Sequence, residues 1–398
     1  MSELPHLILN SQADRRIKKG HLWLYSNEVD TTKTPLKQFQ AGDLVQVQST
    51  AGAVLGLAFI NPQALICGRM LTRDANMNIG RKYLKKRIQS ALKLRELCFE
   101  QPFYRLVYGD SDLLPGVVID RYGQYFVVQI SVAGFEPLIP ELVDLLEVLF
   151  EAKGVLVKND HQARELEGMD EDVRVFGQLP DKLLLEENGC AFEIPSSSGQ
   201  KTGWFYDHRV NRSFLQDLVP GKRVLDVFSY VGGWGIQAAV AGALQVTCVD
   251  ASELACQQVL RNAQINEVDS LVEVIRGKAI DVLKRLNDAG ESFDVVVLDP
   301  PAFIKRKKDQ KSGEAAYRHL NELAIRLLGK EGILVSASCS RPLSNDSLVE
   351  IVRGAARHLD RNAQLIFTGC QGPDHPVHPA IPETNYIKAQ FYRIFREV

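Results

Sequence analysis

The stretch KRVLDVFSYVGGWGIQAAVAG, residues 222–242, decides the fold of this 398-residue chain. An apolar run with β-branched residues leads into a glycine-rich loop, and the loop opens a helical pattern. Four more strand–helix units follow this one. Such alternation indicates a parallel sheet with helices on both faces, so we predict an α/β, Rossmann-like domain. The predicted strands are 222–229, 244–252, 272–277, 293–301 and 332–340, and the predicted helices are 235–242, 253–266, 279–289, 316–329 and 345–358.

The loop after the first strand is the first candidate for a ligand site, because ligands bind beyond the carboxyl ends of the strands in an open parallel sheet. It begins with Asp226 and has glycines at positions 232, 233 and 235. That spacing does not fit the G-x-G-x-x-G pattern of dinucleotide sites, and the sequence has no Walker P-loop. An acidic residue at the start of the loop suits a cationic ligand better than a pyrophosphate.

Acidic residues also follow the second and fourth strands. Asp250 lies 24 residues beyond Asp226, where a carboxylate accepts hydrogen bonds from ribose hydroxyls. The turn Asp299-Pro300-Pro301-Ala302-Phe303 is rigid and suited to holding a flat base. Each aspartate alone is explained equally well as a helix cap. Together, in this order, they predict a site for an adenosyl group with a positive sulfonium, which is S-adenosylmethionine.

Two segments precede this domain. Residues 76–183 combine helical patterns over 81–97 and 136–152 with a pair of strands within 109–131, which predicts an α+β domain. Aspartate favours turns, so no metal site is expected in this segment. Three of its aspartates are interpreted as turn formers rather than metal ligands: Asp110, Asp112 and Asp120.

The first segment, residues 1–75, has short alternating runs broken by glycine, which predict a small β-barrel or sandwich. Residues 1–100 hold 15 Lys and Arg against 8 Asp and Glu, whereas the remaining residues hold 32 against 41. A basic first quarter is typical of a nucleic-acid docking module, although a solvated surface explains it equally well. RRIKKGHLW, residues 15–23, mixes cations with an aromatic ring, a mixture that grips phosphate and stacks on bases.

The seven cysteines are scattered and odd in number, with no C-x-x-C pair, so neither a zinc site nor a disulfide framework is expected. The first residues lack the basic start and apolar core of a signal peptide, and no apolar run approaches the length of a membrane span. These features predict a reducing, cytoplasmic compartment. The net charge of −2 argues neither for nor against an anionic partner.

Seven motifs are spread over the whole chain: HLWLYSNEV, SDLLPGVVIDRYG, KTGWFYDHR, DVFSYVGGWG, VDAS, LDPPAF and SCS. In combination they resemble the bacterial family of large-subunit (23S) ribosomal RNA cytosine-C5 methyltransferases. The resemblance implies a PUA-like RNA-binding domain over 1–75, a central domain over 76–183 and a class I methyltransferase domain over 184–398. It also implies that S-adenosylmethionine is the cofactor, ribosomal RNA the substrate and 5-methylcytidine the product.

The resemblance further implies roles for single residues. Those expected to bind the cofactor are Phe205, Arg209, Asp226, Phe228, Ser229, Tyr230, Gly232, Asp250, Ala251, Ser252, Lys278, Ala279, Asp299 and Pro300. One departure concerns the adenine contact, because relatives often carry an acidic residue after the third strand, where this chain has Arg276-Gly277-Lys278. A charged lysine cannot accept a hydrogen bond, so the contact is left to the backbone there or to Asp281.

The cations of the first segment and those of KRKKDQK, which follows the DPPAF turn, are well placed to grip the RNA backbone. A target base that reaches a buried pocket is flipped out of its stack or is already single-stranded. The residues expected to contact RNA are Arg15, Arg16, Lys18, Lys19, Trp23, Lys305, Arg306 and Lys307.

SASCSRPLS, residues 336–344, ends the fifth strand with Cys339 between two serines. A lone cysteine there is ordinarily a small buried residue. The resemblance implies that Cys339 is the catalytic nucleophile, since C5 of cytosine is a poor nucleophile and a thiolate added to C6 makes it enamine-like. Arg341 and the N-terminus of the following helix are expected to stabilise that thiolate. Asp299 is expected to hold the base or relay the C5 proton, and the base that removes this proton is left open.

Two alternatives stay open. One is a methyltransferase for another target: a guanine or amine methyltransferase would use the same fold without a nucleophile, so Cys339→Ala would spare its activity, and uracil is also left open as the RNA base. The other is a non-catalytic RNA-binding factor for ribosome assembly, which would bind RNA tightly without methyl transfer. His375 and His378 lie in a proline-rich loop and are interpreted as structural. A homodimer through the first or central domain is also left open.

Overall fold

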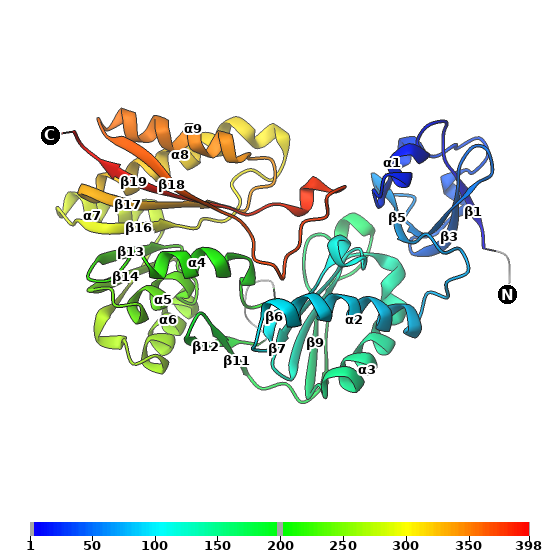
Figure 1. Ribbon diagram of the computed structural model, residues 1–398, viewed down its shortest axis with the longest axis horizontal. Helices are drawn as coiled ribbons and strands as arrows, with labels where there is room; N and C mark the ends of the chain where they lie inside the picture. The colour runs from blue at the N-terminus through cyan, green and yellow to red at the C-terminus, as the bar shows by residue number, and fades with distance from the viewer. Residues whose placement is uncertain (1–3, 197–201, 398) are drawn as a thin grey trace. The chain divides into compact units, whose positions relative to one another are not determined.

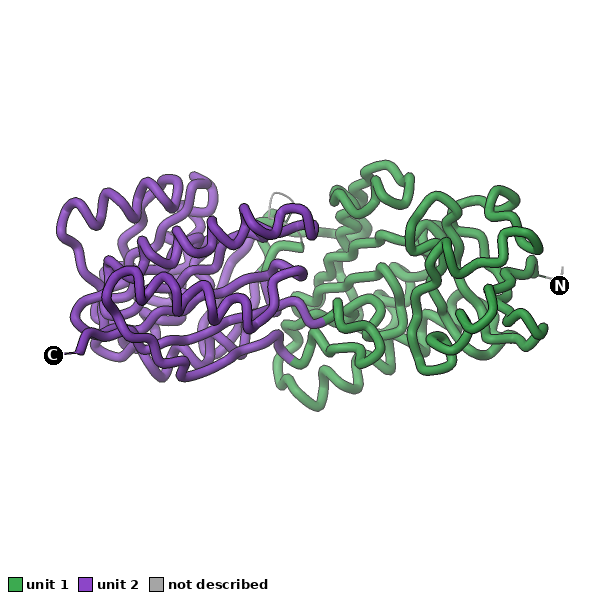
Figure 2. Tube along the Cα trace, turned by 90° about the horizontal axis from the view of Figure 1, so that it is seen from above, with its two compact units in different colours: residues 1–183, 195–204, 373–384 green, residues 184–194, 205–372, 385–398 purple. Residues whose placement is uncertain are grey.

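The computed structural model describes residues 4–196 and 202–397, and the chain divides into two compact units (Figure 2). Each unit is assembled from three separate segments of the chain, so the chain passes repeatedly from one unit to the other. Unit 1 contains residues 1–183, 195–204 and 373–384, and unit 2 contains residues 184–194, 205–372 and 385–398.

Unit 2 is built on a seven-stranded sheet with the order β15-β14-β13-β16-β17-β19-β18 (Figure 1). The five strands from β15 to β17 run parallel, and β19 pairs with both of its neighbours in the antiparallel direction. The strand bounds are β13 Arg223–Val227, β14 Gln245–Asp250, β15 Val272–Arg276, β16 Phe293–Leu298, β17 Leu328–Ser338, β18 Asn362–Gly369 and β19 Lys388–Phe395.

Helices cover both faces of this sheet. Figure 1 shows α4, α5 and α6 against one face and α7, α8 and α9 against the other, where side chains of α7 to α9 share one apolar core with the strands. The central strands β13 and β16 are almost wholly buried, as expected of parallel strands with helices on both sides. The helix bounds are α4 Arg209–Gln216, α5 Gly233–Val240, α6 Glu253–Ile265, α7 Ala279–Asp288, α8 Gln310–Arg326 and α9 Asn345–His358.

The predicted α/β class and all five strand–helix units are confirmed in unit 2. The sheet also has an antiparallel edge, formed by β18 and β19, which the strand–helix alternation did not predict. In that edge Ser338 on β17 lies opposite Lys388 on β19. Unit 2 also includes most of the hairpin β11 (Lys182–Glu187) and β12 (Cys190–Pro195), which turns through Asn188 and Gly189 with positive φ angles of 53° and 79°.

Unit 1 contains two five-stranded sheets, of which the first has the order β1-β3-β4-β5-β2. Its apolar side chains form a core of their own, which includes Leu24 and Val45. The elements are β1 His6–Ile8, α1 Asp14–Lys18, β2 Trp23–Tyr25, β3 Asp43–Gln48, β4 Val54–Ile60 and β5 Ile66–Thr72.

The second sheet of unit 1 has the order β10-β9-β8-β7-β6, and α2 and α3 lie beside it (Figure 1). Apolar side chains of both helices belong to its core. The α2 sequence alternates cations with buried residues such as Leu84 and Ile88, as the predicted amphipathic pattern requires. The elements are α2 Arg81–Cys98, β6 Phe103–Tyr108, β7 Val117–Tyr122, β8 Tyr125–Ile130, α3 Ile139–Phe150, β9 Gly154–Asn159 and β10 Asp172–Gly177.

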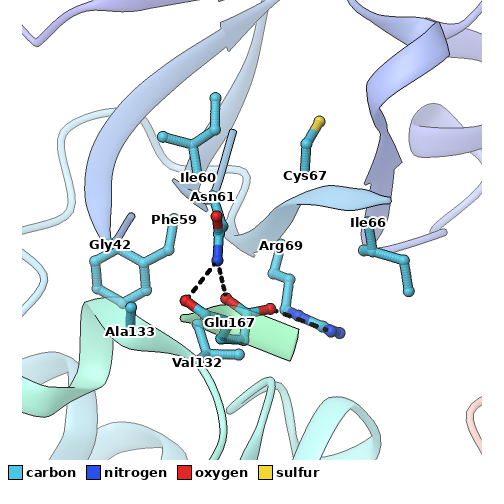
Figure 3. A pocket seen from close by; sticks show the side chains of 10 residues that line it. All are labelled: Gly42, Phe59, Ile60, Asn61, Ile66, Cys67, Arg69, Val132, Ala133 and Glu167. Atoms are coloured by element: carbon cyan, nitrogen blue, oxygen red, sulfur yellow. Dashed lines mark hydrogen bonds and ion pairs between the residues drawn. The ribbon is translucent and has the colours of Figure 1, made fainter. Parts of the chain in front are cut away.

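The two sheets of unit 1 are joined through a small polar contact (Figure 3). Asn61 Nδ2 donates to a carboxylate oxygen of Glu167 at 2.8 Å, and Arg69 lies 3.9 Å from the other oxygen. Burial raises the pKa of Glu167 above its usual value. The cavity beside this contact measures about 10 Å³, enough for a water molecule at most, so we interpret it as a packing joint.

A buried ion-pair network in unit 1 holds the segment 373–384. Arg95, which is fully buried, makes two hydrogen bonds of 2.7 Å to Asp112 and one of 2.8 Å to the carbonyl of Asp374. The Asp374 carboxylate accepts from the ring of His375 at 2.9 Å. His375 therefore has a structural setting, and Asp112 is an ion-pair partner rather than only a turn former.

No helix of the described residues is long and apolar enough to cross a membrane. Within the same residues, no cluster of His, Cys, Asp and Glu has the arrangement of a metal site.

Candidate cofactor and active site

The backbone of the glycine-rich loop after β13 has positive φ angles at a glycine and at two residues that are not glycine. Phe228, Tyr230 and Gly232 have φ angles of 67°, 50° and 87°. A Cβ atom on Gly232 would lie 2.8 Å from Ile236, and one on Gly235 would lie 2.5 Å from Cys248. The loop therefore needs glycine at these positions.

Asp226, near the end of β13, has a fully buried carboxyl group. Its Oδ2 atom accepts from the backbone N–H of Gly235 at 2.8 Å. Its Oδ1 atom and the hydroxyl of Ser229 are buried without a hydrogen-bond partner among the described residues. Burial raises the pKa of Asp226 to about 7, and the charges of Asp299 and Asp250 act in the same direction. Such orphaned acceptors beside a glycine loop fit a cationic ligand with N–H donors.

Asp250 ties the neighbouring loops together at the end of β14. One carboxylate oxygen accepts from the N–H of Tyr230 at 2.9 Å, and the other accepts from the N–H of Ser252 at 2.8 Å. The Asp250 carbonyl accepts from the N–H of Gly277 at 2.9 Å. Each carboxylate oxygen keeps further lone pairs for ribose hydroxyls. Ser252 caps α6 by accepting from Ala255 N–H at 3.3 Å.

The KTGWFYDHR segment reaches this site through Phe205, although its first residue, Lys201, lies outside the described residues. The ring of Phe205 meets that of Tyr230 edge to face with centroids 5.5 Å apart. Arg209 points elsewhere, because its Nε atom lies 3.4 Å from the buried carboxylate of Glu187. The structure therefore brings the ring of Phe205 to the glycine loop, and it places the side chain of Arg209, the first residue of α4, beside Glu187 of β11.

The residues expected at the adenine are less enclosed. Lys278 precedes the first residue of α7 and is exposed, and Asp281 in the first turn of that helix is exposed as well. Ala251 is exposed beside Asp250, whereas Ala279 and Pro300 are buried.

Asp299 stands directly after β16 and has two side-chain partners. Trp234 Nε1–H donates to Oδ2 at 3.0 Å, and His208 Nε2 lies 3.4 Å from Oδ1. The amide Nδ2 of Asn211 lies 3.1 Å from His208 Nδ1, which makes Nδ1 the acceptor and leaves the Nε2 proton for Asp299. Sequence reasoning missed His208 and Trp234, although both lie inside motifs that it singled out.

The His208–Asp299 pair shifts both titrations. Burial lowers the pKa of His208, but the adjacent Asp299 charge outweighs this effect and the net shift is upward. Burial works in the opposite sense on Asp299, yet His208 and the Trp234 hydrogen bond hold the pKa of that carboxyl below its usual value. Asp299, which is 22% exposed, is thus kept as a carboxylate at neutral pH.

Cys339 follows β17 and is partly exposed. Val297 and Leu298 of β16 pair with Val335 and Ser336 of β17, so Asp299 and Cys339 follow neighbouring parallel strands at the same sheet edge. The hydroxyl of Tyr317 bonds Ser338 Oγ at 2.8 Å and Ser340 Oγ at 2.9 Å, which fixes the backbone on both sides of the cysteine.

The cations expected to contact RNA occupy different settings. The side chains of Arg15, Lys18 and Lys19 are exposed on and after α1, and Lys305, Arg306 and Lys307 are exposed after the Asp299 turn. Arg16 is paired with Glu28 at 2.6 Å.

The expectation of a base-stacking Trp23 is not supported by its position. The residue is 9% exposed, and its indole N–H donates at 3.0 Å to Asp110, which lies in the turn between β6 and β7. With so little of its surface exposed and the Arg69 guanidinium 5.8 Å from its ring centroid, Trp23 is not placed to stack on a base.

Comparisons with known proteins agree with this arrangement. Residues 175–379 match the family described as S-adenosylmethionine-dependent methyltransferase, and residues 7–73 match the family described as PUA-like domain. Ribosomal RNA large subunit methyltransferase I of Cronobacter sakazakii is 35% identical over 388 residues, covering 96% of this chain and 97% of that protein. The protein of the same name from Klebsiella pneumoniae subsp. pneumoniae is 34% identical over 399 residues, covering 99% of each.

Solved structures share the fold at lower identity. The structure of a SAM-dependent methyltransferase from Streptococcus mutans is 21% identical to this chain, with a TM-score of 0.82. The match covers 98% of this chain and 100% of that one. A methyltransferase complexed with SAH is 22% identical, with a TM-score of 0.84 and the same coverage.

The sheet order, the loop after β13 and the family matches define an S-adenosylmethionine-dependent methyltransferase that carries a PUA-like domain. The buried acceptors of Asp226 and Ser229 fit this cationic cofactor. On the identity over nearly its whole length, the chain belongs to the ribosomal RNA large subunit methyltransferase I family.

Proposed function

We propose that this protein methylates C5 of a cytidine in large-subunit ribosomal RNA through a covalent bond between Cys339 and C6 of the base. The observation that carries the proposal is the placement of Cys339 and Asp299 after neighbouring parallel strands, beside the buried acceptors of the cofactor loop. A nucleophile and a carboxylate at one sheet edge are what addition to a cytosine ring needs.

The cofactor contacts are part of the proposal. Asp226 and Ser229 would accept from the methionyl end, Asp250 would accept from the ribose hydroxyls, and Phe205 would cover the cofactor with Tyr230. When bound, S-adenosylmethionine supplies an electrophilic methyl group. The chain's own residues then have to orient the base, exclude water and activate its C5 atom.

Cys339 activates the base by covalent addition. Its thiolate forms a bond to C6, and the electron pair of the C5–C6 double bond moves onto C5, which becomes nucleophilic enough to take the methyl group. Loss of the C5 proton to a base then restores the double bond as the C6–sulfur bond breaks. The electron pair of that bond returns to sulfur, so the thiolate is regenerated.

Asp299 is suited to orient the base rather than to donate a proton, because His208 and Trp234 keep it ionised. A carboxylate there accepts a hydrogen bond from the exocyclic amino group of cytosine, a group that uracil lacks. His208 acts through Asp299 and is therefore a positioning residue.

The exposed cations after α1 and after the Asp299 turn would hold backbone phosphates. The proposal includes domain boundaries at 1–75, 76–183 and 184–398. With these boundaries, the cations on and after α1 belong to the PUA-like domain, and those after the Asp299 turn belong to the methyltransferase domain.

The deciding experiment incubates the protein with methyl-labelled S-adenosylmethionine and unmodified large-subunit ribosomal RNA, then digests the RNA to nucleosides. We expect label in 5-methylcytidine with the wild type and a loss of at least about 10³-fold with Cys339→Ala, as for loss of other enzyme nucleophiles. Cys98→Ala, which removes an exposed cysteine, is the matched control and should keep full activity.

Other results would replace the proposal. Label in guanosine or uridine that survives Cys339→Ala would mean that the cysteine is no nucleophile. Tight RNA binding without any transfer of label would favour the non-catalytic assembly factor.

A further inference from the structure

Lys388 is a buried cation in the first position of β19 and is 4% exposed. Its Nζ atom donates to the carbonyl of Ser340 at 2.9 Å and to that of Tyr386 at 2.8 Å. No carboxylate in residues 4–196 and 202–397 forms an ion pair with it. Lysine is almost never fully buried unless it is paired, so its charge requires an explanation.

The negative partner available to Lys388 is the Cys339 sulfur. Ser338 lies opposite Lys388 in the sheet, and the carbonyl that Lys388 holds belongs to Ser340, so the cysteine stands between two backbone positions at the lysine. Burial lowers the pKa of Lys388 to about 8, and the interaction with Cys339 works against that fall. An ammonium group has three N–H donors, of which two are directed to the carbonyls of Ser340 and Tyr386.

Other charged and titratable groups near the pair belong to α8, to the segment before β19 and to the turn after β17. Tyr317 of α8 bonds both flanking serines; burial raises its pKa, and Cys339 adds to that rise. The hydroxyl of Tyr386, just before β19, donates to Asp207 at 2.5 Å. Arg341, which sequence reasoning expected to stabilise the thiolate, is exposed.

We propose that Lys388 is the electrostatic and positioning partner of Cys339: its ammonium stabilises the thiolate, and its hold on the Ser340 carbonyl fixes the turn that presents the sulfur. The role of this pair in catalysis rests on the proposed function above. Lys388 transfers no proton and forms no bond in the reaction. A nearby cation increases the thiolate fraction at neutral pH, and the thiolate is the form that adds to C6.

The test measures the pH dependence of Cys339 alkylation by iodoacetamide, with each cysteine followed separately by peptide mass spectrometry. In Lys388→Met the side chain keeps its length and loses its charge. We expect the midpoint of the alkylation profile of Cys339 to rise by about one pH unit or more, since an opposite charge within a few ångströms shifts a pKa by that amount. Below the midpoint this is a roughly tenfold slower reaction. Lys388→Arg should restore most of the wild-type profile.

Controls within the same sample are Cys98 and Cys370, which are exposed and should react identically in all variants. An unchanged Cys339 midpoint in a folded Lys388→Met protein would overturn the proposal.

A reciprocal measurement covers the case in which Lys388→Met does not fold. Linked titrations are mutual, so Cys339→Ala should lower the pKa of Lys388, which NMR of ¹³C-labelled lysine side chains reports directly. No change in the Lys388 titration would also overturn the proposal. Both readouts are independent of methyl transfer: if 5-methylcytidine does not form while the alkylation midpoint shifts, the proposed function fails and the Lys388–Cys339 pair stands.

Discussion

At the scale of single residues, we expect Asp226 to make the protein's stability and its cofactor affinity depend on pH in opposite directions. Its buried carboxyl has a pKa of about 7 in the folded chain against 3.8 for the free group. Between pH 4 and pH 7 the Asp226 carboxyl is therefore protonated in the folded state and ionised in the unfolded state. The Asp226 contribution to the free energy of unfolding is fully present below pH 4 and falls by up to about 1.4 kcal/mol per pH unit until pH 7.

We expect Asp226→Asn to abolish this fall in the free energy of unfolding with rising pH, because asparagine carries no ionisable group. Without cofactor, the variant should be more stable than the wild type at pH 8 by roughly 1–4 kcal/mol. Its S-adenosylmethionine affinity should fall at least tenfold and lose its rise between pH 6 and 8. Urea unfolding and isothermal titration calorimetry check the two parts. A variant that binds as tightly as the wild type would remove Asp226 from the cofactor site.

At the scale of elements, two serines are N-caps of helices that follow strands of the seven-stranded sheet. Each side chain accepts from the backbone N–H three residues further on. Ser252 accepts from the N–H of Ala255 at 3.3 Å and starts α6, and Ser344 accepts from the N–H of Ser347 at 3.0 Å and starts α9. Ser344 also donates its hydroxyl to Ser347 Oγ at 2.9 Å, whereas Ser252 donates its backbone N–H to Asp250.

We expect Ser252→Ala and Ser344→Ala each to lower the free energy of unfolding by about 1 kcal/mol. Only Ser252→Ala should also weaken cofactor binding, by a few-fold, because a loosened α6 start loosens Asp250. Thermal unfolding and calorimetry of the matched pair test this. Equal cofactor affinities for the two variants would mean that Ser252 is a cap and nothing more.

The elements also show what the sequence could predict. The helix over 345–358 was predicted to the residue, and the five parallel strands were found because apolar runs rich in β-branched residues can be recognised from the local sequence. β18 was missed because it has no uniform apolar pattern, with Leu365 and Ile366 both more than 40% exposed. His208 and Lys388 were missed for another reason: their partners, Asp299 and Cys339, lie far away in sequence, and only the fold brings them together.

At the scale of the whole molecule, exposed cations should make RNA binding depend on salt. We expect replacement of Lys305, Arg306 and Lys307 by alanine to lower RNA affinity and to reduce the slope of log K against log salt concentration by about 2, since each phosphate contact contributes roughly 0.7 to 0.9. The control replaces three exposed lysines of α2, Lys82, Lys85 and Lys86, which removes the same charge. Filter binding over a range of salt concentrations measures both. Equal losses in the two variants would mean that the attraction is diffuse.

The crossing of the chain between the two units has a consequence for inheritance. The first sheet of unit 1 lies in one uninterrupted stretch, from His6 to Thr72, so recombination can add it, delete it or exchange it as a cassette. The rest of the chain cannot be divided in this way, because segments of the two units alternate along the sequence. Residues 195–204 and 373–384 belong to unit 1, and residues 184–194 and 385–398 belong to unit 2. A gene cut anywhere between codons 184 and 384 strands a part of both units. The methyltransferase sheet and the second sheet of unit 1 are therefore expected to have descended together as a single heritable block.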